Sequence, residues 1–74
     1  MTKYAIVFEA PEGPDGNWCA YAPDLPGTAF VGDTFEECRE NALTGIAAHI
    51  DALKRFGYPV PTPTTRVEEL SVAA

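Results

Sequence analysis

The sequence predicts a single α+β domain in which an antiparallel three-stranded sheet and a short C-terminal edge strand pack against one long helix. Residues 34–56 carry apolar side chains at helical spacing. The residues before them instead form short apolar runs separated by glycine and proline, which is typical of strands. A chain of 74 residues has room for one domain, so we place a single domain at residues 1–74.

Three strands are expected before the helix, at residues 3–9, 18–22 and 28–31. The dipeptide Asp15-Gly16 between the first two favours a hairpin turn, which makes these strands antiparallel. Both faces of each strand are apolar or aromatic. Because a single helix covers one face of a sheet, the other face needs a second cover.

A second copy of the chain is the expected cover, so we predict at least a dimer. A chain this short buries only about 60% of its unfolded surface, which favours self-association. Aromatic side chains on the strands can contribute core packing and subunit contacts; these are Trp18, Tyr21 and Phe30. The same residues could stack RNA bases, but the charges near them are acidic, which disfavours that function.

The helix is expected to begin at Thr34 and end near Phe56. Thr34 with Glu37 three residues later forms a capping box. Gly57 can take the left-handed conformation that ends a helix, and Pro59 prevents the helix from continuing. Gly45 falls on the apolar side of the helix, so we expect the helix and the sheet to approach closely there.

The residues after the helix are expected to return to the sheet. Residues 58–63 contain three prolines and favour an extended connector. Thr65 and Glu68 have the spacing of a capped helical turn, and residues 70–74 are predicted to add the last edge strand.

The composition excludes several classes of function. Eleven acidic and five basic residues give a net charge of -6, which opposes nucleic-acid binding and suits a basic protein partner. The two cysteines, Cys19 and Cys38, fall in a strand and in the helix, and are interpreted as small apolar residues without a disulfide. Residues 5–8 are too short an apolar run for a signal peptide or a membrane span, so a cytoplasmic protein is expected.

No catalytic constellation is evident. His49 is the only histidine, and one histidine with two separated cysteines does not provide the ligands of a zinc site. A nuclease that uses two metal ions would need converging carboxylates, but the candidate acids fall on separate elements; these are Glu9, Asp24, Asp33 and Asp51. We therefore expect no enzyme activity, metal or cofactor.

Two motifs resemble a known family. They are YAPDLPG at residues 21–27 and GDTFEEC at residues 32–38, and together they resemble the HicB-like antitoxin family. His49, Leu53 and Gly57 and the proline-rich exit are also similar to this family. The similarity extends over nearly the whole chain.

The resemblance implies a β-β-β-α-β domain similar to a truncated ribonuclease-H-like fold without nuclease activity. It also implies the role of an antitoxin in a type II toxin-antitoxin system, which binds and neutralises a small basic HicA-type toxin that cleaves mRNA. Longer members carry a C-terminal DNA-binding domain. Because this sequence ends at Ala74, we expect no direct DNA binding.

An acidic surface is the predicted contact for such a partner. Pro23 and Pro26 would hold two of its residues outward, and the helix start supplies the rest; the set is Asp24, Leu25, Asp33, Glu36 and Glu37. The turn at residues 24–27 can equally serve as a rigid connection, and Asp33 can serve the helix dipole. Two other functions remain open, a stand-alone oligomeric binding module and a metal-dependent ribonuclease-H-like nuclease.

Overall fold

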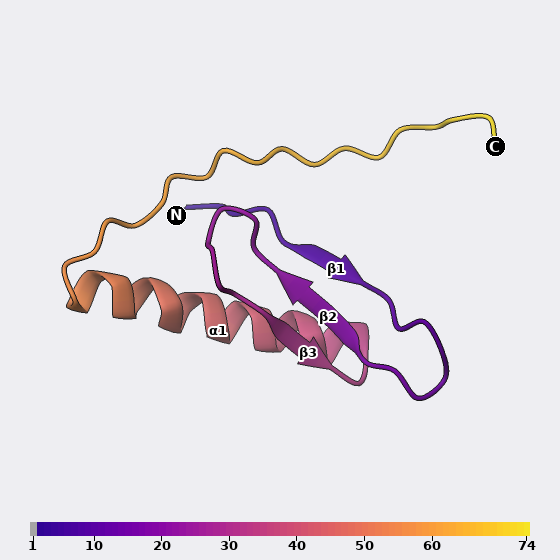
Figure 1. Cartoon of the computed structure of the whole chain (residues 1–74), viewed down its shortest axis with the longest axis horizontal. Coiled ribbons are helices and arrows are strands. Elements are labelled where there is room, and N and C mark those ends of the chain that lie inside the picture. The colour runs from indigo at the N-terminus through magenta and orange to yellow at the C-terminus, as the bar shows by residue number, and fades with distance from the viewer. Residues whose placement is uncertain (1) are drawn as a thin grey trace.

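The computed structural model describes residues 2–74 and has an antiparallel three-stranded sheet with one helix on it (Figure 1). The strand order is β1-β2-β3, so β1 and β3 are the sheet edges. The elements are β1 (Val7–Glu9), β2 (Trp18–Tyr21), β3 (Phe30–Gly32) and α1 (Phe35–Arg55). The predicted α+β class, with three strands followed by one long helix, is confirmed.

The first strand is shorter than expected because of its register. Val7 pairs with Tyr21, the last residue of β2. Residues 3–6 therefore extend past the end of β2 and have no strand to pair with. They nevertheless continue the alternation of β1, so that Tyr4 and Ile6 lie on the same side as Phe8.

The side chains that face the helix form the core. Phe8, Ala20 and Phe30 lie side by side across the three strands. Ala20 is buried together with Cys38 and Ala42 of the helix. On the opposite face of the sheet, Cys19 lies beside Val31 and both are exposed. The helix thus covers one face only.

Two glycines let the helix approach the third strand. An ideal Cβ on Gly45 would clash with the ring of Phe30, so the ring occupies the space that a side chain would fill. A Cβ on Gly32 would clash with the backbone of Cys38 in the first turns of α1. The predicted close contact at Gly45 is confirmed, and it places the helix mainly over β3 and β2.

The ends of the helix agree with the sequence. The Thr34 hydroxyl accepts a hydrogen bond from the Glu37 N–H at 3.1 Å, while Glu37 Oε1 accepts from the Asp33 N–H at 3.4 Å, one residue earlier than in a standard capping box. At the other end Gly57 has a φ of 75°. The Tyr58 N–H donates to the Leu53 carbonyl at 2.9 Å, which closes the helix as expected.

The tail after the helix differs from the prediction. Residues 58–74 are extended and form neither the helical turn expected at Thr65 nor the edge strand expected at residues 70–74 (Figure 1). The Tyr4 hydroxyl donates to the Pro61 carbonyl at 2.6 Å, and Asp24 binds Thr64 and Thr65. Beyond Thr65 no backbone hydrogen bond joins the described residues of the tail to β1, so the single chain has no edge strand there.

Candidate functional site

The residues predicted to contact a partner fall into two groups at opposite ends of β3. Asp24 and Leu25 lie in the connection before this strand, and the other three lie after it, at the start of α1 (Figure 1). The structure therefore does not bring the five residues onto one surface. The second group, Asp33, Glu36 and Glu37, is called the acidic helix start below.

The turn that contains Leu25 is held by its own hydrogen bonds. The Leu25 N–H donates to the Ala22 carbonyl at 3.0 Å, and the Thr28 hydroxyl donates to the Leu25 carbonyl at 2.8 Å. Gly27 has a φ of 84°, which favours glycine. The Leu25 side chain is 0% exposed. The expectation that the flanking prolines hold Leu25 outward is therefore corrected: the side chain points into the protein and packs there.

Asp24 binds the tail of its own chain. Its Oδ2 accepts from the N–H groups of Thr64 and Thr65, both at 3.0 Å, and its Oδ1 accepts from their hydroxyls at 3.0 and 2.8 Å. These bonds lower the pKa of the Asp24 carboxyl from 3.8 to about 2, and the bond from the Thr65 N–H makes the largest contribution. An ionised carboxylate has about four acceptor sites, so the tail uses all of them.

The acidic helix start is open to solvent. All three of its carboxylates are exposed, and Glu36 and Glu37 lie in the first turn of α1. Negative charge is favoured there by the helix dipole, and Glu37 also accepts the hydrogen bond from Asp33 described above. These residues therefore stabilise the helix and at the same time present a negative surface.

The aromatic residues predicted for subunit contact lie on both faces of the sheet. Trp18 packs edge-on against Phe35 of the helix, with 5.3 Å between ring centroids, and Phe30 lies under Gly45. Tyr21 lies on the face without a helix and is 41% exposed. Trp18 and Phe30 therefore contribute to the core of the single chain, and Tyr21 alone is on the open face.

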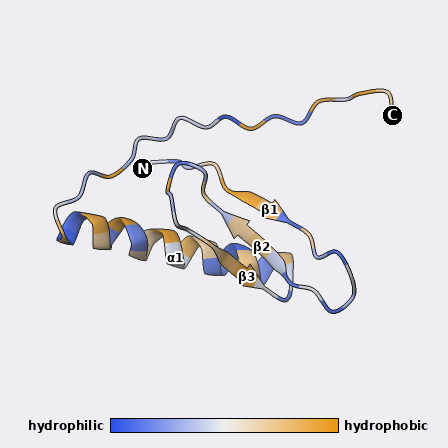
Figure 2. Cartoon of the chain, viewed as in Figure 1, coloured by the Kyte–Doolittle hydropathy of each residue, from blue (hydrophilic) through white to orange (hydrophobic). Residues whose placement is uncertain are grey.

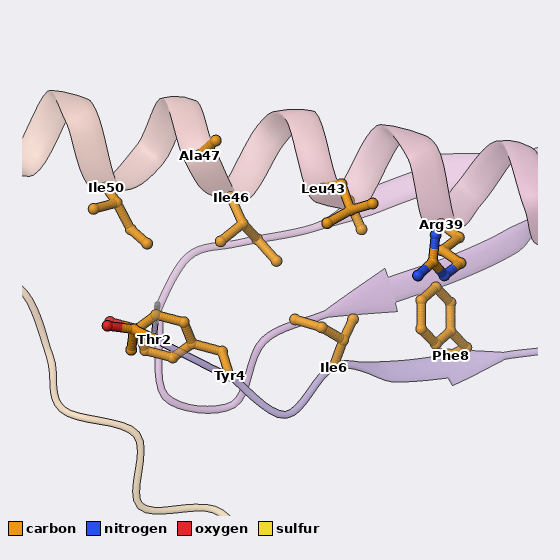
Figure 3. Close-up of a pocket in the computed structure, with 10 residues that line it drawn as sticks. Thr2, Tyr4, Ile6, Phe8, Arg39, Leu43, Ile46, Ala47 and Ile50 are labelled. Atoms are coloured by element: carbon orange, nitrogen blue, oxygen red, sulfur yellow. The ribbon is translucent and has the colours of Figure 1, made fainter.

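An apolar groove between β1 and α1 was not identified from the sequence. It has a volume of about 440 Å³ and is open between the two elements (Figure 3). Figure 3 shows apolar side chains reaching into it from both sides. The first segment of the chain contributes Tyr4, Ile6 and Phe8, and α1 contributes Leu43, Ile46 and Ile50. Arg39 is its charged residue and lies beside Phe8. We call this feature the β1–α1 groove.

The structure offers little for catalysis. Among residues 2–74 no three His, Cys, Asp or Glu side chains are placed to hold a metal ion. Cys38 is buried, and burial, with a smaller contribution from nearby Cys19, raises the pKa of its thiol, which disfavours the reactive thiolate.

Among residues 2–74, no helix has the length and apolar character needed to cross a membrane.

Comparisons with known proteins identify the family. The family model described as "HicB_like antitoxin of bacterial toxin-antitoxin system" matches residues 4–73. The chain belongs to this HicB-like antitoxin family. A relative from Synechocystis sp., the UPF0150 protein ssr1765, is 38% identical over 70 residues, which are 95% of this chain and 86% of the relative. No solved structure gives a significant match.

The region that matches the family model, residues 4–73, contains the features described above. It includes the turn around Leu25, the acidic helix start and the part of the tail that Asp24 binds. The resemblance expected from the two sequence motifs is thereby confirmed. Family membership suggests an antitoxin role, since the printed description assigns the family to bacterial toxin-antitoxin systems.

Proposed function

We propose that this HicB-like protein is the antitoxin of a type II pair that binds and neutralises a small basic HicA-type toxin, an mRNA-cleaving ribonuclease, in the cytoplasm. The observation that carries the proposal is the family match over residues 4–73. The net charge of -6 agrees with it, because a ribonuclease must attract phosphate groups and is therefore expected to present a basic surface.

We place the contact surface at the acidic helix start. Its three carboxylates are exposed, whereas Asp24 is engaged by the tail and Leu25 is buried. Opposite charges accelerate the encounter of two proteins and contribute less to the lifetime of the complex. By covering the surface that binds RNA, the acidic helix start would compete directly with the substrate of the toxin.

Binding kinetics with the toxin test this placement. The toxin to test is any small basic protein found to be encoded beside this chain, and its rates of binding to wild type and to Glu36→Lys are measured at two salt concentrations. Glu36→Lys should lower the on-rate by about three- to ten-fold at low salt, with a smaller effect at high salt. Asp51→Lys makes the same charge change toward the other end of α1, where the residue is also exposed, and should leave the on-rate close to that of wild type. Equal on-rates for both variants would place the contact elsewhere.

A stand-alone oligomeric binding module is the second candidate function. The β1–α1 groove favours it, because a groove of this size lined by apolar side chains can take a peptide or another chain. A toxin that neither binds the protein nor loses activity in its presence would favour this function over the antitoxin. The groove would then be the first place to look for the ligand.

We infer that the protein has no nuclease activity and no direct binding to DNA. Asp24, one of the acids that could be considered as a metal ligand, has its acceptor sites occupied by four hydrogen bonds from the tail. The negative net charge opposes contact with phosphate backbones. RNA cleavage that depends on a divalent ion and disappears in Asp24→Asn would restore the ribonuclease-H-like nuclease reading.

A further inference from the structure

We propose that two copies of this chain exchange their C-terminal tails, so that residues 66–74 of each copy bind in the β1–α1 groove of the other. This range is called the tail segment here. The tail segment would add a strand to the free edge of β1 in the partner copy. The proposal does not depend on the antitoxin function.

The groove is a surface that residues 2–74 leave uncovered. Because α1 lies mainly over β3 and β2, the side of the helix that faces β1 is left with an open groove between them. Leu43, which lines the groove, is 54% exposed. Within the part of the chain that the structure describes, β1 pairs with β2 alone, so its outer edge is free. An exposed edge of this kind is a template for another strand.

The tail segment has the pattern of the missing strand. In an extended chain alternate side chains share a face, so Leu70, Val72 and Ala74 lie on one side. Leu70 is 76% exposed and Val72 is 78% exposed. In Figure 2 the end of the tail carries the hydrophobic colours that β1 also shows. An extended segment with one apolar face that none of the described residues covers fits an apolar groove beside a strand edge.

Charge agrees with this pairing. Glu68 lies two residues before Leu70, on the same face of the extended tail segment. If the tail segment runs antiparallel to β1, placing Leu70 opposite Ile6 brings Glu68 opposite Phe8. Arg39 lies beside Phe8 in the groove (Figure 3). Glu68, which pairs with Arg66 of the tail segment at 3.1 Å in the single chain, would then meet Arg39, the basic residue of the groove.

The surface area of the single chain also supports a dimer. The chain exposes 5913 Å², whereas a compact monomer of its 8.0 kDa mass exposes about 4,500 Å². The excess of about 1,400 Å² exceeds the roughly 800 Å² that each partner buries in a standard interface. Its radius of gyration of 14.1 Å is likewise above the roughly 11 Å expected for 74 residues.

Asp24 holds the part of the tail that comes just before the tail segment. By binding Thr64 and Thr65 it fixes the point from which the tail segment leaves its own domain. The tail segment then needs to lose freedom only over the residues that follow. Exchange of an identical element between two copies keeps the interface two-fold symmetric, so each contact is made twice.

Light scattering on the full chain tests the dimer. Wild type should give about 16 kDa at micromolar concentration, twice the 8.0 kDa of one chain. Leu43→Lys in the groove and Leu70→Glu in the tail segment should each raise the dimer dissociation constant by about 100-fold, because each places a charge in the apolar contact twice. Val31→Lys is the matched control, since Val31 is 55% exposed but on the other face of the sheet. It should remain a dimer.

Mixing the two variants distinguishes tail exchange from other dimers. A Leu43→Lys copy has an intact tail segment, and a Leu70→Glu copy has an intact groove. An equimolar mixture should therefore recover a species of about 16 kDa, with one wild-type contact and one Lys–Glu pair. The proposal is overturned by a wild-type mass of 8 kDa, by loss of the dimer in Val31→Lys, by a dimer that survives Leu70→Glu, or by a mixture that stays monomeric.

Discussion

The carboxylate of Asp24 accepts both the backbone N–H and the hydroxyl of Thr65, at 3.0 and 2.8 Å, across 41 positions of the sequence. Together with the equivalent bonds from Thr64, this contact ties the tail to the turn between β2 and β3. Asp24, which was predicted to contact a partner, thus holds the tail of its own chain. The position of residues 64 and 65 depends on the charge and the geometry of this side chain, while Tyr4 holds the tail separately at Pro61.

Asp24→Asn should release the tail without unfolding the domain. The asparagine amide has one acceptor oxygen where the carboxylate has two, and its NH₂ group would face the donors of the threonines. Hydrogen exchange at the Thr64 and Thr65 amides should therefore become faster, while exchange in α1 stays unchanged. Asp15→Asn, in the exposed turn between β1 and β2, is the control with the same loss of charge. Protected threonine amides in Asp24→Asn would show that the tail is held by other contacts.

The same contact should depend on pH in acid. The pKa of Asp24 is about 2 in the folded chain and ordinarily 3.8. Because the folded pKa is the lower one, the contact contributes its full stability above about pH 4 and loses it as the pH falls through 2. The amide resonances of Thr64 and Thr65 should shift over this window. Asp24→Asn should show no such transition, and a wild-type titration centred near pH 4 would contradict the charge-assisted contact.

Leu25→Ala should destabilise the fold by about 2–5 kcal/mol, as expected when a buried leucine is truncated. The side chain is 0% exposed, so its removal leaves a cavity beneath the turn. Urea unfolding should show a lower midpoint with the same slope. Val31→Ala, at a residue that is 55% exposed, should stay within about 0.5 kcal/mol of wild type. If the two variants were equally stable, Leu25 would be a surface residue after all.

The sequence predicts the elements well because their signals are local. Thr34 and Glu37 mark the start of α1, and Gly57 marks its end, through bonds between residues at most five positions apart. The strands follow from apolar runs between turns in the same way. The limits of β1 were missed because they depend on the register with Tyr21, which no local pattern determines.

The site was harder to predict because it depends on contacts between distant residues. No feature of the PDLP sequence tells whether Leu25 points inward, or that Asp24 meets residues 40 positions later. The groove was not predicted for the same reason. The sequence predicts β1 and α1, which form its two walls, but it does not predict that α1 lies over β3 and so leaves a space beside β1. That placement follows from packing between Phe30 and Gly45.

Gly45→Ala should destabilise the protein although alanine favours helices more than glycine does. On an exposed helix the change would stabilise by roughly 1 kcal/mol. Here the new Cβ would clash with the Phe30 ring, and such overpacking costs about 1–3 kcal/mol. The clash should therefore cancel or exceed the helix gain, and the unfolding midpoint in urea should not rise.

A double-mutant cycle separates the two effects. In a Phe30→Leu background the aromatic ring is gone, so Gly45→Ala should there raise stability relative to Phe30→Leu alone. Thr44→Ala, at the exposed neighbouring position of the helix, reports the gain in helix propensity without a contact to the ring. If Gly45→Ala stabilised the wild type as much as Thr44→Ala does, the helix and β3 would be farther apart than the contact of Gly45 with Phe30 requires.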